Sequence, residues 1–153
     1  MRRLLASLLV LVAVAALPWA AAARGELFPQ PAGLEPRVEF WRRVFTEVGT
    51  EGGFIHDARD LAVVYEVVRH PEARSARQRA RHQERRKDHY KRILHELASG
   101  DRGDLSEEER RVLGLFPRGV SRSRLREAAT DVRFQRGQAD KFLAGLRRMG
   151  RWE

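Results

Sequence analysis

Apolar residues recur every three to four positions over residues 38–48, which is the period of an amphipathic helix. The residues that share this face are Val38, Phe40, Trp41, Val44, Phe45 and Val48. Pro36 stands at a first-turn position, where a proline fits a helix, and Gly49 follows the last apolar residue. The pattern therefore predicts a helix over residues 36–48. Because Trp41 belongs to the apolar face, we expect its side chain to be buried.

A change of pattern after this helix predicts a β-hairpin. Gly52 and Gly53 release the chain into the apolar pair Phe54 and Ile55, and the turn-like residues 57–60 follow. Residues 61–68 are rich in β-branched and aromatic side chains, which suit a pleated and half-buried surface. We expect one short antiparallel hairpin, with strands near residues 53–57 and 62–68.

The rest of the chain has a helical pattern. His70 ends the second strand because the residue before a proline avoids the helical region. No helix breaker occurs over residues 72–98, where apolar side chains gather only at the C-terminal end, at Tyr90, Ile93, Leu94 and Leu97. We expect this end of the helix to pack against the domain and the N-terminal end to project.

Three shorter elements are predicted beyond this helix. Ser106 and Glu109 match a capping box at the start of one helix, and Ser121 caps another that we expect to reach Val132. The apolar segment 134–149 is also expected to be helical, with Gly137 marking either a kink or a boundary. The predicted fold class is mainly α, a small helical domain (residues 36–150) with one short antiparallel β-hairpin.

The first 23 residues are typical of a cleaved secretory signal peptide. Arg2 and Arg3 precede an apolar run over residues 4–17, and Ala21 and Ala23 form a cleavage pattern. This run is shorter than the ~20 residues that span a bilayer, although an uncleaved inner-membrane anchor is the alternative. Residues 24–35 are expected to form an extended lead-in segment against the domain.

Charge and export together limit the partners. The 153-residue chain holds 30 Lys and Arg against 21 Asp and Glu, a formal charge of +9, and it has no cysteine. No disulfide or lipidated cysteine is therefore available. In the periplasm, where the leader directs the chain, the accessible polyanions are wall polymers and anionic lipid headgroups rather than nucleic acid.

The candidate polyanion-binding residues lie on the helix predicted over residues 72–98. They are Arg74, Arg77, Arg81, Arg85, Arg86 and Lys87. The alternative interpretation is a solvated helix that binds nothing.

No constellation in the sequence indicates an active site. Glu35, Glu39, Glu47 and Glu51 are candidates for the water-poor carboxylic acid that glycan cleavage requires, although a carboxylate on an amphipathic helix is usually only part of its solvated face. His56 and Asp57 suit a general base with its orienting partner, or else a hairpin turn in which Asp57 binds local backbone amides.

Metal and cofactor motifs are missing from the sequence as well. His82 and His89 lie seven residues apart on one helix, and two histidines are too few for a closed metal site. We therefore assign no catalytic, cofactor-binding or metal-binding residue.

Several short motifs, in this order, resemble the N-terminal region of exported lytic murein transglycosylases, in particular the membrane-bound lytic murein transglycosylase D-like proteins. They include Val38-x-Phe-Trp41, Gly53-Phe-Ile-His-Asp57 and Val132-Arg-Phe-Gln-x-Gly-Gln-Ala-Asp-x-Phe142. The resemblance covers about residues 27–153. It implies a peptidoglycan-remodelling protein whose family cleaves the MurNAc–GlcNAc bond without hydrolysis.

One departure from that family bears on activity. The family's catalytic acid belongs to a Glu-Ser pair in a following lysozyme-like domain, and this sequence contains no Glu-Ser dipeptide. We therefore expect a non-catalytic N-terminal region, with residues 151–153 beginning a truncated segment. The alternative is a stand-alone periplasmic adaptor that binds cell wall or anionic membrane through its basic helix.

Overall fold

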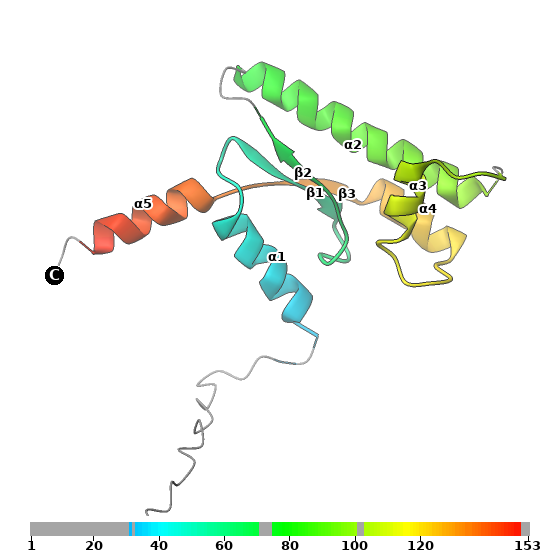
Figure 1. Cartoon of the computed structure of the whole chain (residues 1–153), viewed down its shortest axis with the longest axis horizontal. Helices are drawn as coiled ribbons and strands as arrows, with labels where there is room; N and C mark the ends of the chain where they lie inside the picture. Colours follow the sequence, from blue (N-terminus) through cyan, green and yellow to red (C-terminus); the bar gives the residue numbers. More distant parts are fainter. Residues whose placement is uncertain (1–30, 32, 71–74, 101–102, 151–153) are drawn as a thin grey trace, which may run out of the picture. The chain divides into compact units, whose positions relative to one another are not determined.

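The computed structural model describes residues 31, 33–70, 75–100 and 103–150 (Figure 1). In this part of the chain, five helices and three strands follow one another. They are α1 (Glu35–Thr46), β1 (Gly52–Asp57), β2 (Val64–Arg69), α2 (Ala76–Ser99), α3 (Glu107–Leu113), α4 (Arg122–Thr130), β3 (Val132–Arg136) and α5 (Ala139–Met149). All of them belong to one unit, Ala32–Glu153.

The three strands form an antiparallel sheet in the order β2-β1-β3. Phe54 of the central strand pairs with Val67 on one side and with Gln135 on the other. Every residue of β1 is buried. Gly53 is required here, because a Cβ at this position would overlap the Gln135 carbonyl oxygen of the neighbouring strand.

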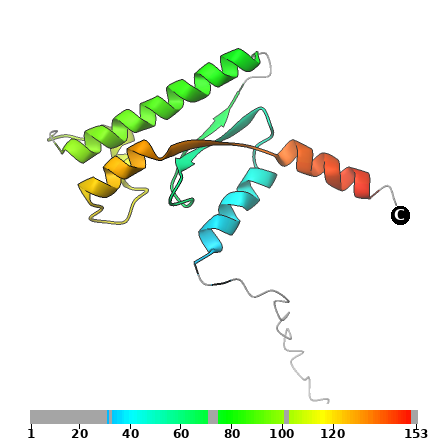
Figure 2. The same cartoon turned by 180° about the vertical axis from the view of Figure 1, so that it is seen from behind.

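Successive side chains of β1 point to opposite faces of the sheet, and each face has its own core. Ile55 packs with residues of α2, α3 and α4, including Leu94, Val112 and Ala128. Phe54 packs on the other face with Phe40 of α1. Figures 1 and 2 show α2 on one side of the sheet and α1 on the other.

The predicted mainly α fold and its hairpin are confirmed in outline, but the hairpin is not the whole sheet. The two predicted strands correspond to β1 and β2. The helix beginning at Ser121 was expected to include Val132, and the segment 134–149 was expected to be helical, with a kink or a boundary at Gly137. The helical assignment of residues 132–136 was wrong, because α4 ends at Thr130 and these residues form the third strand. Gly137 is a boundary between β3 and α5.

The expectation that Trp41 is buried was also wrong. Its exposed fraction is 43%, whereas Phe40 and Val44 are almost fully buried. The apolar arc of α1 is wider than the surface of the sheet that covers it. Positions 40, 44 and 48 face Phe54, while Val38, Trp41 and Phe45 form a second, exposed stripe.

Helix starts follow the sequence closely. Ser106 and Glu109 form the predicted capping box, and the Ser121 side chain caps α4. The long basic helix begins at Ala76 with a capping box of its own, formed by Ser75 and Gln78. Pro36 lies in the first turn of α1, as predicted.

Several sequence expectations concern residues outside the described ranges. The signal peptide (residues 1–23), residues 24–30 and 32 of the lead-in segment (24–35) and the last three residues (151–153) are among them. At the end of that segment, Glu35 is not extended but is the first residue of α1. Within the described ranges, no helix is both long enough and apolar enough to span a bilayer.

Candidate polyanion-binding helix

The helix α2 is continuous over 24 residues because both of its ends are capped. Ser75 Oγ accepts a hydrogen bond from the Gln78 amide, and Gln78 Oε1 accepts one from the Ser75 amide. At the other end, Gly100 adopts a left-handed conformation with φ of 71°, which a glycine adopts without strain. A rise of 1.5 Å per residue makes the helix about 36 Å long.

Its C-terminal half is anchored in the larger core, as the sequence predicted. Tyr90, Ile93, Leu94 and Leu97 are buried. The ring of Tyr90 stacks on Tyr65 of β2, with 5.5 Å between centroids. Because the C-terminal half is held against the core, one defined face of the N-terminal half is exposed to solvent.

Three of the predicted site residues form an exposed stripe on that outward face. Arg77, Arg81 and Arg85 recur at four-residue steps, so that they lie one above another on the helix. Arg92 continues the stripe, which then spans about 22 Å along the helix axis. Within the described residues, none of these four guanidinium groups has an acidic partner. Among the residues that the structure describes, the stripe is therefore an array of positive charge without ion-pair partners.

The other predicted residues do not belong to this stripe. Arg86 donates to Glu66 Oε2 of β2 at 2.7 Å and to the Tyr90 hydroxyl at 3.3 Å, so it fastens α2 to the sheet. The Lys87 ammonium binds Glu84 at 3.0 Å. Arg74 lies outside the described residues. The set that the sequence grouped together therefore separates into an exposed stripe and internal ion pairs.

The four candidate carboxylates of the N-terminal segment are exposed and already paired or hydrogen-bonded. Glu47 contacts Arg43 at 3.0 Å and Glu51 contacts Arg79 at 3.0 Å. Glu35 accepts a hydrogen bond from the Gly33 amide.

Glu39 has the wrong electrostatics for a general acid. Its carboxylate accepts hydrogen bonds from Arg42 at 2.5 and 2.7 Å, and these bonds lower its pKa from 4.5. A general acid needs the opposite shift, which comes from a dry pocket.

His56 and Asp57 are not a catalytic pair. They are neighbours in β1, so their side chains point to opposite faces of the sheet. The ring of His56 lies against Phe40 at 4.6 Å, and burial lowers its pKa from 6.5. Asp57 Oδ1 accepts hydrogen bonds from the Arg59 and Asp60 amides, which confirms the structural turn interpretation.

The two histidines that the sequence analysis considered, His82 and His89, contact different partners. The ring of His82 lies against that of His70, with centroids 5.1 Å apart, whereas His89 Nε2 lies 2.9 Å from Glu108 Oε2. The described residues contain no group of three or more His, Cys, Asp or Glu side chains arranged to hold a metal ion.

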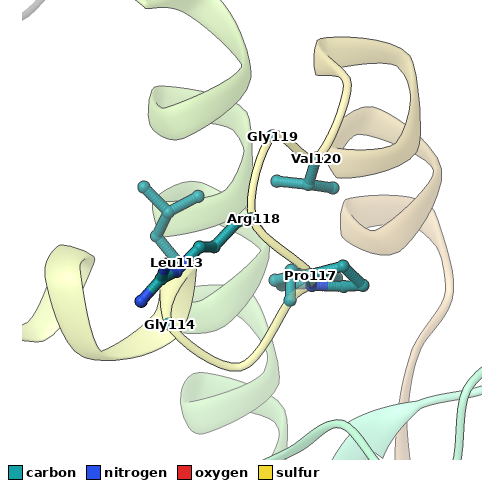
Figure 3. A pocket seen from close by; sticks show the side chains of 7 residues that line it. Leu113, Gly114, Pro117, Arg118, Gly119 and Val120 are labelled. Atoms are coloured by element: carbon teal, nitrogen blue, oxygen red, sulfur yellow. The ribbon is translucent and has the colours of Figure 1, made fainter.

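A pocket of about 480 Å³ lies at the connection between α3 and α4 (Figure 3). Its lining residues are Leu113, Gly114, Phe116, Pro117, Arg118, Gly119 and Val120. Arg118 is the only ionisable group among them. This pocket therefore contains neither a carboxylate nor a nucleophile.

Sequence reasoning missed two features of the structure. Arg92 falls outside the predicted set, yet a seven-residue step from Arg85 returns to the same face of the helix. The second feature is the exposed apolar surface of α1 and α5. Trp41 was expected to be buried with the apolar face of the first helix, because periodicity alone does not distinguish a covered stripe from an uncovered one.

Comparison of the chain with known protein families, curated proteins and solved structures gave no significant match.

Proposed function

We propose that this chain is the non-catalytic N-terminal region of a periplasmic lytic murein transglycosylase-like protein, and that it binds anionic wall polymer through α2. The family assignment rests on the motifs of the sequence. The binding assignment rests on one observation, the exposed stripe of Arg77, Arg81 and Arg85 without carboxylate partners among the described residues.

The geometry of the stripe suits a long, flexible polyanion better than a small ligand. Its charges are about 6 Å apart along the helix, one per helical turn, which spreads them over a length that only an extended ligand can match. Such binding is mainly electrostatic, so it weakens as salt screens the charges beyond a Debye length of ~8–10 Å. Arg86 and Lys87 contribute little, because Glu66 and Glu84 already neutralise them.

Co-sedimentation with isolated sacculi tests the binding assignment. We expect the wild-type chain to sediment at low ionic strength and much less at physiological ionic strength. The triple variant Arg77→Gln/Arg81→Gln/Arg85→Gln should sediment weakly at both. A matched control, Arg110→Gln/Arg118→Gln/Arg126→Gln, removes the same charge from exposed positions on α3, α4 and their connection. Equal loss in both variants would show that only net charge matters and would contradict a role for α2.

A second measurement tests the non-catalytic assignment. Incubation of the purified chain with peptidoglycan should release no anhydromuropeptides above the buffer background, because every candidate carboxylate of the described residues is exposed, paired or locked in a turn. Release above background would overturn this part of the proposal.

The adaptor alternative uses the same stripe. The gene sequence beyond the codon for residue 153 distinguishes the two, because the family assignment requires a Glu-Ser pair followed by a Gly-Leu-Met-Gln-like stretch.

A further inference from the structure

A second surface of the molecule, separate from the α2 stripe, carries large apolar side chains that are exposed to solvent. Its residues are exposed by 40–63% and come from two helices. They are Val38, Trp41 and Phe45 of α1, and Phe142, Leu143, Leu146 and Met149 of α5. We call this surface the α1–α5 face.

The two halves of this face are continuous. The rings of Trp41 and Phe45 lie 6.2 Å apart, and Phe45 lies 6.0 Å from Phe142 of α5. Contiguous exposed apolar surface of this kind marks an interaction site more often than isolated exposed residues do.

Backbone hydrogen bonds hold the two helices in this arrangement. The amides of Gln138 and Ala139 donate to the carbonyls of Val44 and Val48, at 2.8 and 3.1 Å. The first turn of α5 therefore satisfies acceptors that the end of α1 leaves open. The Asp140 carboxylate adds hydrogen bonds from the amide and hydroxyl of Thr50.

Positive charge borders the apolar side chains. Lys141, Arg147 and Arg148 of α5 are exposed, and within the described residues they have no acidic partner. The nearby acids are already engaged, since Asp140 binds Thr50 and Glu39 binds Arg42. The face therefore combines large apolar and aromatic side chains with cations that have no acidic partner in the described part of the chain.

We propose that the α1–α5 face lies on an anionic lipid surface. Helices that rest in the membrane interface bury a Trp-, Phe- and Leu-rich side and place Lys and Arg at the headgroups. The composition of α5, with Trp41 and Phe45 beside it, fits that description. Tryptophan also favours the interfacial region because its ring is apolar with one polar edge.

A second copy of this chain fits the face less well. A symmetric dimer brings the same patch of both copies together, so the cations of α5 in one copy would approach those in the other. A phosphate-rich surface has the complementary charge. This inference concerns a different surface from the α2 stripe and does not depend on the proposed function.

Fluorescence of Trp41 tests the inference in the full chain. In a Trp19→Phe/Trp152→Phe background Trp41 is the only tryptophan, since the chain has three. The protein is mixed with vesicles of phosphatidylcholine and phosphatidylglycerol, in which brominated acyl chains act as the quencher and phosphatidylglycerol supplies the anionic headgroups. Vesicles of phosphatidylcholine alone are the reference. The apolar residues 4–17 have access to both kinds of vesicle, so a difference in Trp41 emission between the two reports on the lipid charge.

We expect quenching and a blue shift of Trp41 emission with the anionic vesicles and much less of either with the reference. Phe142→Ser/Leu146→Ser should abolish the quenching. Arg147→Gln/Arg148→Gln should weaken the anionic-lipid affinity on the order of 30-fold, since each basic residue contributes roughly fivefold at such a surface. Arg110→Gln/Arg126→Gln, at exposed positions of α3 and α4, removes the same charge and should leave the Trp41 signal unchanged.

Three results would overturn the inference. One is the absence of quenching in anionic vesicles, and another is equal quenching in both vesicle types. The third is a blue shift that grows with protein concentration without lipid, which would assign the face to a second copy. Circular dichroism of each variant checks that the fold is retained.

Discussion

Arg124 Nη2 donates a 2.6 Å hydrogen bond to Oδ2 of Asp57, a carboxylate without exposed surface. The bond joins the end of the central strand β1 to the first turn of α4. The Tyr65 hydroxyl lies 3.4 Å from the same carboxylate oxygen, and the Arg124 guanidinium lies over the ring of Phe116. A charge in the core is thus matched by one partner from a helix 67 residues away.

Removing Arg124 should therefore destabilise the domain strongly. We expect Arg124→Ala to lower the free energy of unfolding by about 3 kcal/mol, at the lower end of the range for breaking a buried pair, because its side chain is 27% exposed. Urea denaturation measures the change. The exposed neighbour Arg126→Ala should cost less than about 0.5 kcal/mol. Equal costs would mean that the pair contributes nothing specific.

Adjacent aromatic residues of α1 should differ sharply in their contribution to stability. Phe40 is 2% exposed and Trp41 is 43% exposed. We expect Phe40→Ala to cost about 3–5 kcal/mol, as for a large core truncation, and Trp41→Ala to cost about 1 kcal/mol. Thermal or chemical unfolding of both variants checks this. A larger loss for Trp41 would show that this ring is covered in the folded protein.

The same two residues show how far the sequence could predict the fold. The spacing of apolar residues in α1 is enough to establish a helix, and the glycines with the β-branched run establish the hairpin. Spacing does not say which half of a wide apolar arc meets a sheet, so Trp41 was placed in the core. Phe40 is buried because it packs against Phe54 of the sheet, and the helical spacing alone does not indicate this contact.

The third strand was missed for a related reason. Val132 and Phe134 alternate with Arg133 and Gln135, which is a strand pattern, but it is only five residues long and directly follows a helix. Short alternating runs are ambiguous without knowledge of a partner strand. The partner here is β1, about 80 residues earlier.

For the candidate site, the sequence could identify the basic helix. It could not show that Arg85 is exposed while Arg86 is paired, because that difference depends on the position of Glu66 in β2.

Gly137 should tolerate no larger residue. A Cβ at this position would overlap the Val48 carbonyl oxygen, where the end of β3 crosses the end of α1. We expect Gly137→Ala to destabilise the domain by about 1–3 kcal/mol through this overlap. Gly145→Ala in α5 meets nothing closer than 3.9 Å, so it should stabilise by about 0.5–1 kcal/mol. Unfolding midpoints of the two variants should therefore shift in opposite directions.

His56 should make stability depend on pH in mildly acidic solution. Burial lowers its pKa in the folded state below the ordinary 6.5, so the unfolded chain takes up a proton first as the pH falls. The contribution of neutral, buried His56 to the free energy of unfolding is fully present above pH 6.5, and it is lost as the pH falls toward the lowered pKa of this residue. Urea midpoints at several pH values below 7.5 should fall more steeply for the wild type than for His56→Gln. The exposed His95→Gln should retain the wild-type profile, and an unchanged slope in His56→Gln would exclude His56 as the cause.

The arginine stripe should be slightly destabilising in the absence of a ligand. Arg77, Arg81 and Arg85 are successive like-charge neighbours at four-residue spacing, which costs a few tenths of a kcal/mol per pair. We expect the triple glutamine variant to be as stable as the wild type or more stable by up to about 0.5 kcal/mol at low salt. Added salt should narrow this difference. A clear loss of stability would mean that the stripe has contacts within the folded chain.

The central position of β1 also determines the order in which the sheet is completed. β2 follows β1 along the chain and pairs with one of its edges, but the other edge pairs with residues 132–136. During synthesis, the hairpin therefore leaves the ribosome with Phe54 and Ile55 on a strand whose second edge is open, and that edge closes only after α2, α3 and α4 have been made. An open apolar edge invites pairing with other chains. Ribosome stalling or premature termination before residue 132 should accordingly yield an aggregation-prone product, although all the residues of the first strand pair are present.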